Sequence, residues 1–230
     1  MSSVTDHGVM VDERRRRQLG TALIGAAIAY LSAAASLGFV AASSPPARLL
    51  DDLVEFERGL VLYRIGFAGA SLLAPSLVTL IVLVVSAAEV PTASVRRWIG
   101  SILLAAYVPL ATVAYTTQYA VLPRLVARDP EAAAPWYFHD VDSIPYGLDL
   151  AGYALLGLAV MVFAGTLAER GRRALAGWLV ATGSLSVVAF ALHAVGATAV
   201  AGIASLTSAA STVPVALLGI AEGRRLRAVR

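Results

Sequence analysis

Long apolar runs constrain this chain more than any other feature. A helix needs about 20 mostly apolar residues to cross about 30 Å of hydrocarbon. The stretch from 174 to 221 carries no charged residue and is too long for one crossing, so we expect a turn near Gly196. The sequence predicts an all-α, polytopic integral membrane protein with six transmembrane helices. The predicted spans are 19–42, 62–87, 98–121, 144–168, 174–195 and 198–221, in one membrane domain (19–221) between short basic tails (1–18 and 222–230).

Composition supports this class and excludes several kinds of chemistry. The chain is 58% hydrophobic and 14% charged, whereas soluble domains carry about 25% charged residues. It contains no Cys, which removes disulfides, thiolate nucleophiles and iron–sulfur clusters. All basic residues other than His are Arg, which removes Schiff-base lysines. Nucleotide-binding loops and the common hydrolase motifs are absent from the sequence, so we predict no cofactor.

The distribution of arginine predicts the orientation in the membrane. Of the 18 Arg, 13 lie in the N-terminal tail, near residues 88–97 and 169–173, and in the C-terminal tail. Most acidic residues lie in the connections 43–61 and 122–143. By the positive-inside rule, both termini face the cytoplasm and these two connections face outward. The first apolar run is longer than a signal-peptide core, so we expect it to be retained. An Ala-, Gly- and Arg-rich composition without Lys suggests a bacterial source, and thus the bacterial cytoplasmic membrane.

The outward connections are predicted to have structure of their own. In 43–61, apolar residues spaced i, i+3 and i+4 among charges favour a short helix lying on the outer surface. The aromatic residues of 136–138 are typical of the interfacial belt. His139, Asp140 and Asp142 offer three metal-ligand types, but their spacing matches no metal motif. We therefore predict no metal site.

Asp149 is a carboxylate inside the fourth predicted span. It lies about 9 Å along the helix from Ser143, at 1.5 Å per residue. Tyr146, Asp149 and Tyr153 are spaced i, i+3 and i+7 and share one helix face. An unpaired charge at this depth costs a few kcal/mol, so the side chain should face the bundle interior or a hydrated cavity. Other spans place polar residues at the same level: Arg64, Tyr115, Gln118 and His193.

This polar layer predicts an outward-facing pocket that binds or transports a small molecule or ion. Arg64 would hold an anionic group and Asp149 a cation or a proton. A second hypothesis is an intramembrane enzyme acting on a lipid or isoprenoid, with Asp149 as general acid or base and His193 as its partner. A third is a structural or accessory subunit in which Arg64 and Asp149 form a packing ion pair. The predicted ligand-binding residues are Arg64, Tyr115, Gln118, Tyr146, Asp149, Tyr153 and His193.

Expected partners follow from the same features. We expect membrane lipids around the spans and a small-molecule ligand in the predicted polar pocket. The Arg residues fall in short clusters beside apolar runs, which does not indicate nucleic-acid binding.

Gln118 has a simpler interpretation as a hydrogen-bonding link between helices. Pro75, Pro109 and Pro214 fall inside spans and are expected to bend them.

Overall fold

The computed structural model describes residues 3–88 and 94–228, with side chains from Glu13 onward. The described residues form helices, short turns and loops, with no strand. Six helical segments are long and apolar enough to cross a membrane, which confirms the predicted all-α, six-span class. These segments are Glu13–Ala42, Leu53–Ala87, Val95–Ala120, Ile144–Glu169, Arg173–Ala194 and Thr198–Ala228.

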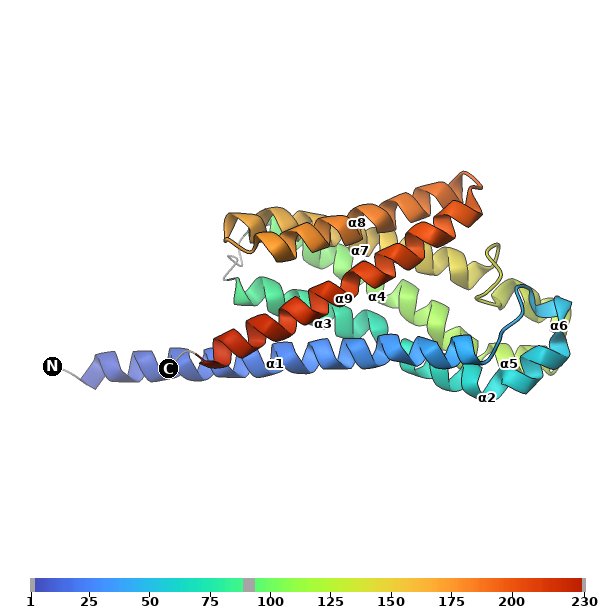
Figure 1. Cartoon of the computed structure of the whole chain (residues 1–230), viewed down its shortest axis with the longest axis horizontal. Coiled ribbons are helices and arrows are strands. Elements are labelled where there is room, and N and C mark those ends of the chain that lie inside the picture. Colours follow the sequence, from blue (N-terminus) through green and yellow to red (C-terminus); the bar gives the residue numbers. More distant parts are fainter. Residues whose placement is uncertain (1–2, 89–93, 229–230) are drawn as a thin grey trace.

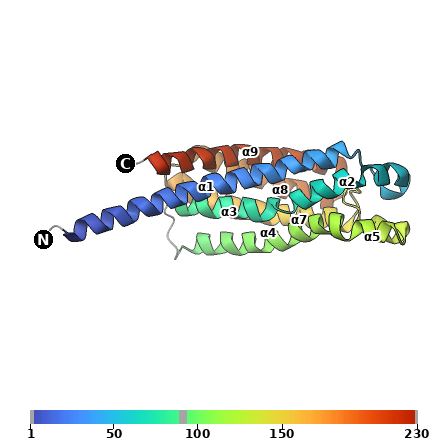
Figure 2. The same cartoon turned by 90° about the horizontal axis from the view of Figure 1, so that it is seen from below.

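The helices lie roughly side by side as an elongated bundle (Figures 1 and 2). Both termini lie at one end, which also holds the turn at residues 170–172, and we call it the Arg-rich end. The opposite end holds α5, α6 and the turn between α8 and α9, and we call it the loop end. The elements are α1 (Ser3–Ala42), η1 (Leu49–Asp51), α2 (Leu53–Ala70), α3 (Leu73–Ala87), α4 (Val95–Ala120), α5 (Leu122–Val126), α6 (Pro130–Ala133), η2 (Ala134–Trp136), α7 (Ile144–Glu169), α8 (Arg173–Ala194) and α9 (Thr198–Ala228).

The second span begins earlier than the apolar pattern suggests. Asp52 caps α2, accepting a hydrogen bond from the Glu55 backbone N–H at 2.8 Å, so the helix starts at Leu53 and not near residue 62. Phe56 in its first turns is buried. Residues 53–61 of the segment expected to lie on the outer surface are therefore the first turns of this helix, which continues into the span. The first helix is also longer than its apolar run, because α1 begins at Ser3 and extends beyond the other helices at the Arg-rich end (Figure 2).

Proline affects the three spans differently. Pro75 follows a break at residues 71 and 72, where α2 ends and α3 begins. Its ring removes an N–H donor and crowds the carbonyl four residues earlier, which accounts for the break. Pro109 and Pro214 lie inside the continuous helices α4 and α9.

Small residues and hydroxyls hold the last three helices together. A Cβ added to Gly157 of α7 would lie 2.6 Å from the carbonyl oxygen of Gly183 in α8, so only glycine allows this approach. At the α8–α9 interface, the hydroxyls of Thr182 and Ser211 and of Ser186 and Ser208 are 2.7 and 2.6 Å apart, respectively. Close backbone approach and interhelical hydrogen bonds are the main sources of helix association in lipid. The chain turns between α8 and α9 at Gly196, with φ of 81°.

Candidate functional site

Gln118 of α4 lies at the centre of a fully hydrogen-bonded cluster at the loop end. Its Oε1 accepts hydrogen bonds from the Tyr63 hydroxyl at 2.8 Å and from the Phe138 backbone N–H at 3.1 Å. Its Nε2 donates to the backbone carbonyls of Trp136 at 2.9 Å and Ala114 at 3.3 Å. The side chain is completely buried. Gln118 thus joins α4 to α2 and to the segment before α7. We call the interacting residues the Gln118 cluster: Tyr63, Ala114, Gln118, Trp136 and Phe138.

The connection from 121 to 143 packs onto the end of the bundle as a cap. Leu122, Ala133 and Tyr137 within it are completely buried. The Tyr137 hydroxyl donates a hydrogen bond to the Pro46 carbonyl at 2.7 Å, which ties this connection to the one between α1 and α2. Asp129 caps the short helix α6 by accepting from the Ala132 N–H at 3.0 Å. The two predicted outer connections therefore form one packed structure.

His139 is enclosed by aromatic rings within this cap. Its ring centroid lies 5.6 Å from that of Tyr137, 5.9 Å from that of Tyr63 and 6.2 Å from that of Phe67. Its Nε2 atom is buried and has no hydrogen-bond partner. Burial lowers the pKa of His139 to about 4, because the protonated ring would lose its hydration. His139 is therefore neutral at physiological pH.

Asp149 lies in the second turn of α7, which begins where Ser143 accepts a hydrogen bond from the Tyr146 N–H at 3.3 Å. The Asp149 side chain is 6% exposed. Tyr115 of α4 lies beside the carboxyl group, and Tyr153 lies beside Tyr115. One carboxyl oxygen, Oδ1, is buried without any hydrogen-bond partner. The carboxyl group thus keeps an unused acceptor in an aromatic, water-poor surrounding.

His193 at the end of α8 approaches the same group through Tyr146. The two ring centroids lie 5.5 Å apart in an edge-to-face arrangement, and Tyr146 also interacts electrostatically with Asp149. The Nδ1 atom of His193 is buried and has no partner. We call the residues around the carboxyl group the Asp149 cluster: Tyr115, Tyr146, Asp149, Tyr153 and His193.

Arg64 stands apart from both clusters. Its side chain is exposed on α2, and the ion pairs formed by the described residues do not include it. The carboxyl group of Asp149 is also absent from these ion pairs. The structure therefore brings together six of the seven predicted residues at one end of the bundle but leaves Arg64 facing outward.

Tyr107 is a neighbour of the site that the sequence analysis did not select. Its ring is completely buried in α4, with its centroid 5.6 Å from that of Tyr153. Its hydroxyl has no hydrogen-bond partner. Tyr107 precedes Gln118 by 11 residues, which is about three helical turns, so both lie on the same face. That spacing was a usable signal, but Tyr107 lies deeper than the predicted polar layer.

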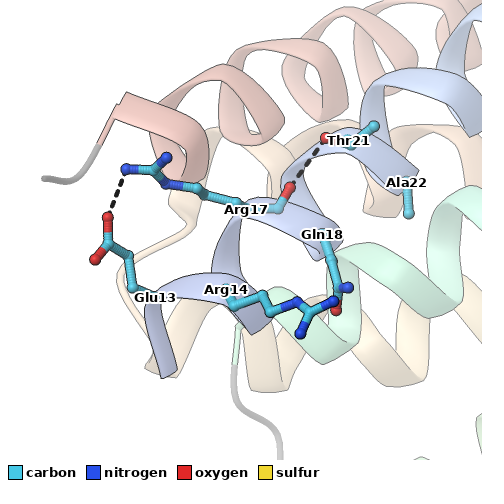
Figure 3. A pocket seen from close by; sticks show the side chains of 6 residues that line it. All are labelled: Glu13, Arg14, Arg17, Gln18, Thr21 and Ala22. Atoms are coloured by element: carbon cyan, nitrogen blue, oxygen red, sulfur yellow. Dashed lines mark hydrogen bonds and ion pairs between the residues drawn. The ribbon is translucent and has the colours of Figure 1, made fainter. Parts of the chain in front are cut away.

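Hollows lined by described residues lie at the Arg-rich end, away from Asp149. One of about 820 Å³ is lined by a face of α1, including Arg14, Gln18 and Thr21 (Figure 3). There Arg17 forms an ion pair with Glu13 at 2.5 Å and accepts a hydrogen bond from the Thr21 hydroxyl on its carbonyl (Figure 3). By contrast, the Asp149 side chain is only 6% exposed.

Neither a metal-binding group nor a known relative points to a function for this site. No group of three or more His, Asp or Glu side chains among the described residues is placed to hold a metal ion. No protein-family model matches the chain, and no curated protein or solved structure matches it. The function must therefore be argued from the chemistry of the site.

Proposed function

We propose that this multi-pass membrane protein binds or transports a proton, a cation or a small molecule carrying one, with Asp149 as the group that receives it. The observation that carries the proposal is the unpartnered Oδ1 of a buried carboxyl group inside a membrane span. An ionisable residue at such a position is expensive to keep unless it has a task. A proton or a cation would satisfy the free oxygen and neutralise the charge.

The neighbouring side chains suit this role. Tyr115 and Tyr146 both lie near the carboxyl group. Tyrosine ring faces favour a cation, and their hydroxyls accept or donate hydrogen bonds as the protonation state changes. His193, with its unpartnered Nδ1 against Tyr146, would form the outer part of the path to Asp149.

We place the protein in the bacterial cytoplasmic membrane with both termini in the cytoplasm. The support is the location of the termini and several Arg clusters at one end of the bundle, together with the positive-inside rule. The loop end, and with it the Asp149 cluster, would then face outward. A ligand would approach through the cap formed by residues 121–143.

Labelling with a hydrophobic carbodiimide tests whether Asp149 takes up a proton. Carbodiimides react with protonated carboxyl groups in apolar surroundings, and peptide mass spectrometry locates the product. We expect Asp149 to be labelled in the full chain in lipid nanodiscs, and labelling to decrease as pH rises. Protection by sodium or potassium would identify a cation that competes with the proton.

Two variants complete this experiment. Asp149→Asn should remove the pH-dependent product, whereas Asp142→Asn, at an exposed carboxyl group in the cap, should leave it unchanged. Failure of Asp149 to react at any pH, in a protein that is folded by circular dichroism, would contradict the proposal. The carboxyl group would then be sealed from exchange.

A structural role is the second candidate, and one observation favours it for part of the site. Both acceptor positions of the Gln118 Oε1 and both N–H donors of its Nε2 have partners in the protein. Such a residue joins helices and needs no ligand. The enzymatic alternative has less support, because no hydrogen bond is formed between His193 and Asp149 among the described residues.

A further inference from the structure

A separate pocket at the Arg-rich end combines an apolar lining with positive charge. It has a volume of about 290 Å³ and lies between the end of α3, the start of α8 and the last turns of α9. Apolar side chains line it from all three elements: Val84, Leu175 and Leu218. Three arginines also line it: Arg172, Arg173 and Arg225. This pocket is unrelated to Asp149, which lies towards the other end of the bundle.

The spacing of residues along α9 and α3 explains why charged and apolar side chains line the same pocket. Leu218, Glu222 and Arg225 of α9 are spaced i, i+4 and i+7, so they lie on one face with the arginine nearest the helix end. Val84 and Ala88 near the end of α3 follow the same spacing. On α9, the apolar lining therefore lies towards the middle of the bundle, and the charges lie towards its Arg-rich end.

The pocket retains an excess of positive charge. Arg172 forms an ion pair with Glu222 at 2.6 Å, and both side chains are partly buried. Arg173 and Arg225 form no ion pair among the described residues. Since Glu222 is neutralised by Arg172, the two remaining guanidinium groups are available to an anion. Guanidinium groups recognise phosphate oxygens with paired N–H donors.

Two exposed tryptophans at this end of the bundle suit the depth of lipid headgroups. Trp98 near the start of α4 and Trp178 near the start of α8 are 64% and 42% exposed, respectively. Exposed Trp side chains are enriched at the membrane–water interface. A ligand in this pocket would therefore have its charge at the headgroup level and its apolar part beside the helices.

We propose that this pocket binds an anionic phospholipid, with Arg173 and Arg225 holding the phosphate and Val84, Leu175 and Leu218 contacting the first part of an acyl chain. Its volume is at the lower end of ligand pockets, which suits a headgroup and the upper chain, not a whole lipid. A free phosphate would use the same arginines but not the apolar lining.

Native mass spectrometry of the detergent-purified full chain tests the proposal. We expect phosphatidylglycerol to remain bound at least about tenfold more tightly than phosphatidylcholine of the same chain length. Arg173→Gln combined with Arg225→Gln should remove this preference. The matched control is Arg124→Gln combined with Arg128→Gln, two arginines at the loop end, which should retain it.

A second variant and a second ligand make the result decisive. Ala221→Phe would fill the apolar part of the pocket without changing its charge, and it should also reduce phosphatidylglycerol binding. Inorganic phosphate alone should not compete at millimolar concentration. Equal retention of both lipids by the wild type, or retained preference in the double Arg173 and Arg225 variant, would overturn the proposal. Effective competition by inorganic phosphate would show a small-anion site and also overturn it.

Discussion

Two polar clusters lie next to each other at the loop end, and they differ in how completely their hydrogen bonds are made. Tyr115 and Gln118 lie about one turn apart on α4. Tyr115 belongs to the Asp149 cluster and Gln118 to the Gln118 cluster. The Gln118 amide has partners on α2, on α4 and in the cap. The Asp149 carboxyl group has an oxygen with no partner at all.

This difference in hydrogen bonding indicates which buried polar residues stabilise the fold and which are available to a ligand. Their depth in the membrane does not distinguish them, because both clusters lie at the loop end. A buried group whose hydrogen bonds are all made stabilises the arrangement that makes them. A buried ionisable group with an unmade bond costs free energy, which is tolerated where a ligand or proton completes it. The Gln118 cluster should therefore respond to mutation through stability, and the Asp149 cluster through binding.

The largest loss of stability is expected for Gln118→Leu. Leucine is similar in size but would leave the Tyr63 hydroxyl, the Phe138 N–H and the Trp136 carbonyl without their partner. Each buried group left unsatisfied costs about 1 to 3 kcal/mol, so we expect a total loss of at least about 3 kcal/mol. Denaturant unfolding in mixed micelles, followed by circular dichroism, would measure it.

Thr116→Ala is the matched control for this change, because Thr116 lies in the same helical turn and is outside the Gln118 cluster. We expect that variant to remain within about 0.5 kcal/mol of the wild type. If Gln118→Leu were equally mild, the hydrogen bonds of the cluster would not be a source of stability, and the contrast between the clusters would fail.

The next largest effect concerns His139 and pH. Its pKa is lowered to about 4, so below the usual histidine pKa the unfolded chain binds a proton that the folded chain excludes. Stability from the neutral ring is thus fully present above about pH 6.5 and is lost as pH falls towards 4. We expect a loss of about 2 to 3 kcal/mol over this interval. Unfolding curves measured at several pH values would show it.

His139→Phe isolates this contribution from the carboxyl groups that titrate over part of the same range. Phenylalanine suits the ring environment of Tyr63, Phe67 and Tyr137 and cannot be protonated. The difference in unfolding free energy between wild type and His139→Phe should therefore change with acidification. A difference that stays constant from neutral to acid pH would show that His139 is already accessible to protons in the folded state.

The sequence predicted the fold better than it predicted the site. The membrane's thickness requires long apolar runs, so the six spans could be identified from the positions of these runs in the sequence. Helical spacing also placed Tyr146, Asp149 and Tyr153 on one face. Which polar residues meet depends on how helices rotate and pack, and on the cap, for which the chain has no periodic pattern. The sequence therefore predicted Gln118 and Asp149 as parts of one pocket, whereas the structure gives them separate surroundings.

Asp149→Asn should have a much smaller effect on stability than Gln118→Leu. Asparagine preserves the shape of the side chain and replaces a buried ionisable group with a neutral one, while the contact with Tyr115 can still form. We expect the free energy of unfolding to change by less than about 1 kcal/mol at neutral pH. The same denaturant measurement applies. A loss comparable with that of Gln118→Leu would mean that Asp149 is mainly structural, and would remove the distinction between the two clusters.

The smallest effect is expected for Arg64→Gln. Its side chain is exposed and forms no ion pair among the described residues, so its removal should alter stability by less than about 0.5 kcal/mol. The charge exchange Arg64→Asp with Asp149→Arg offers a sharper test, because a true ion pair would tolerate exchange. We expect the exchanged protein to be no more stable than Asp149→Arg alone, since an arginine placed among Tyr115, Tyr146 and Tyr153 gains no carboxylate from residue 64. Recovery of stability on exchange would show that the two positions meet, and Asp149 would then belong with Gln118 among the residues that hold helices together.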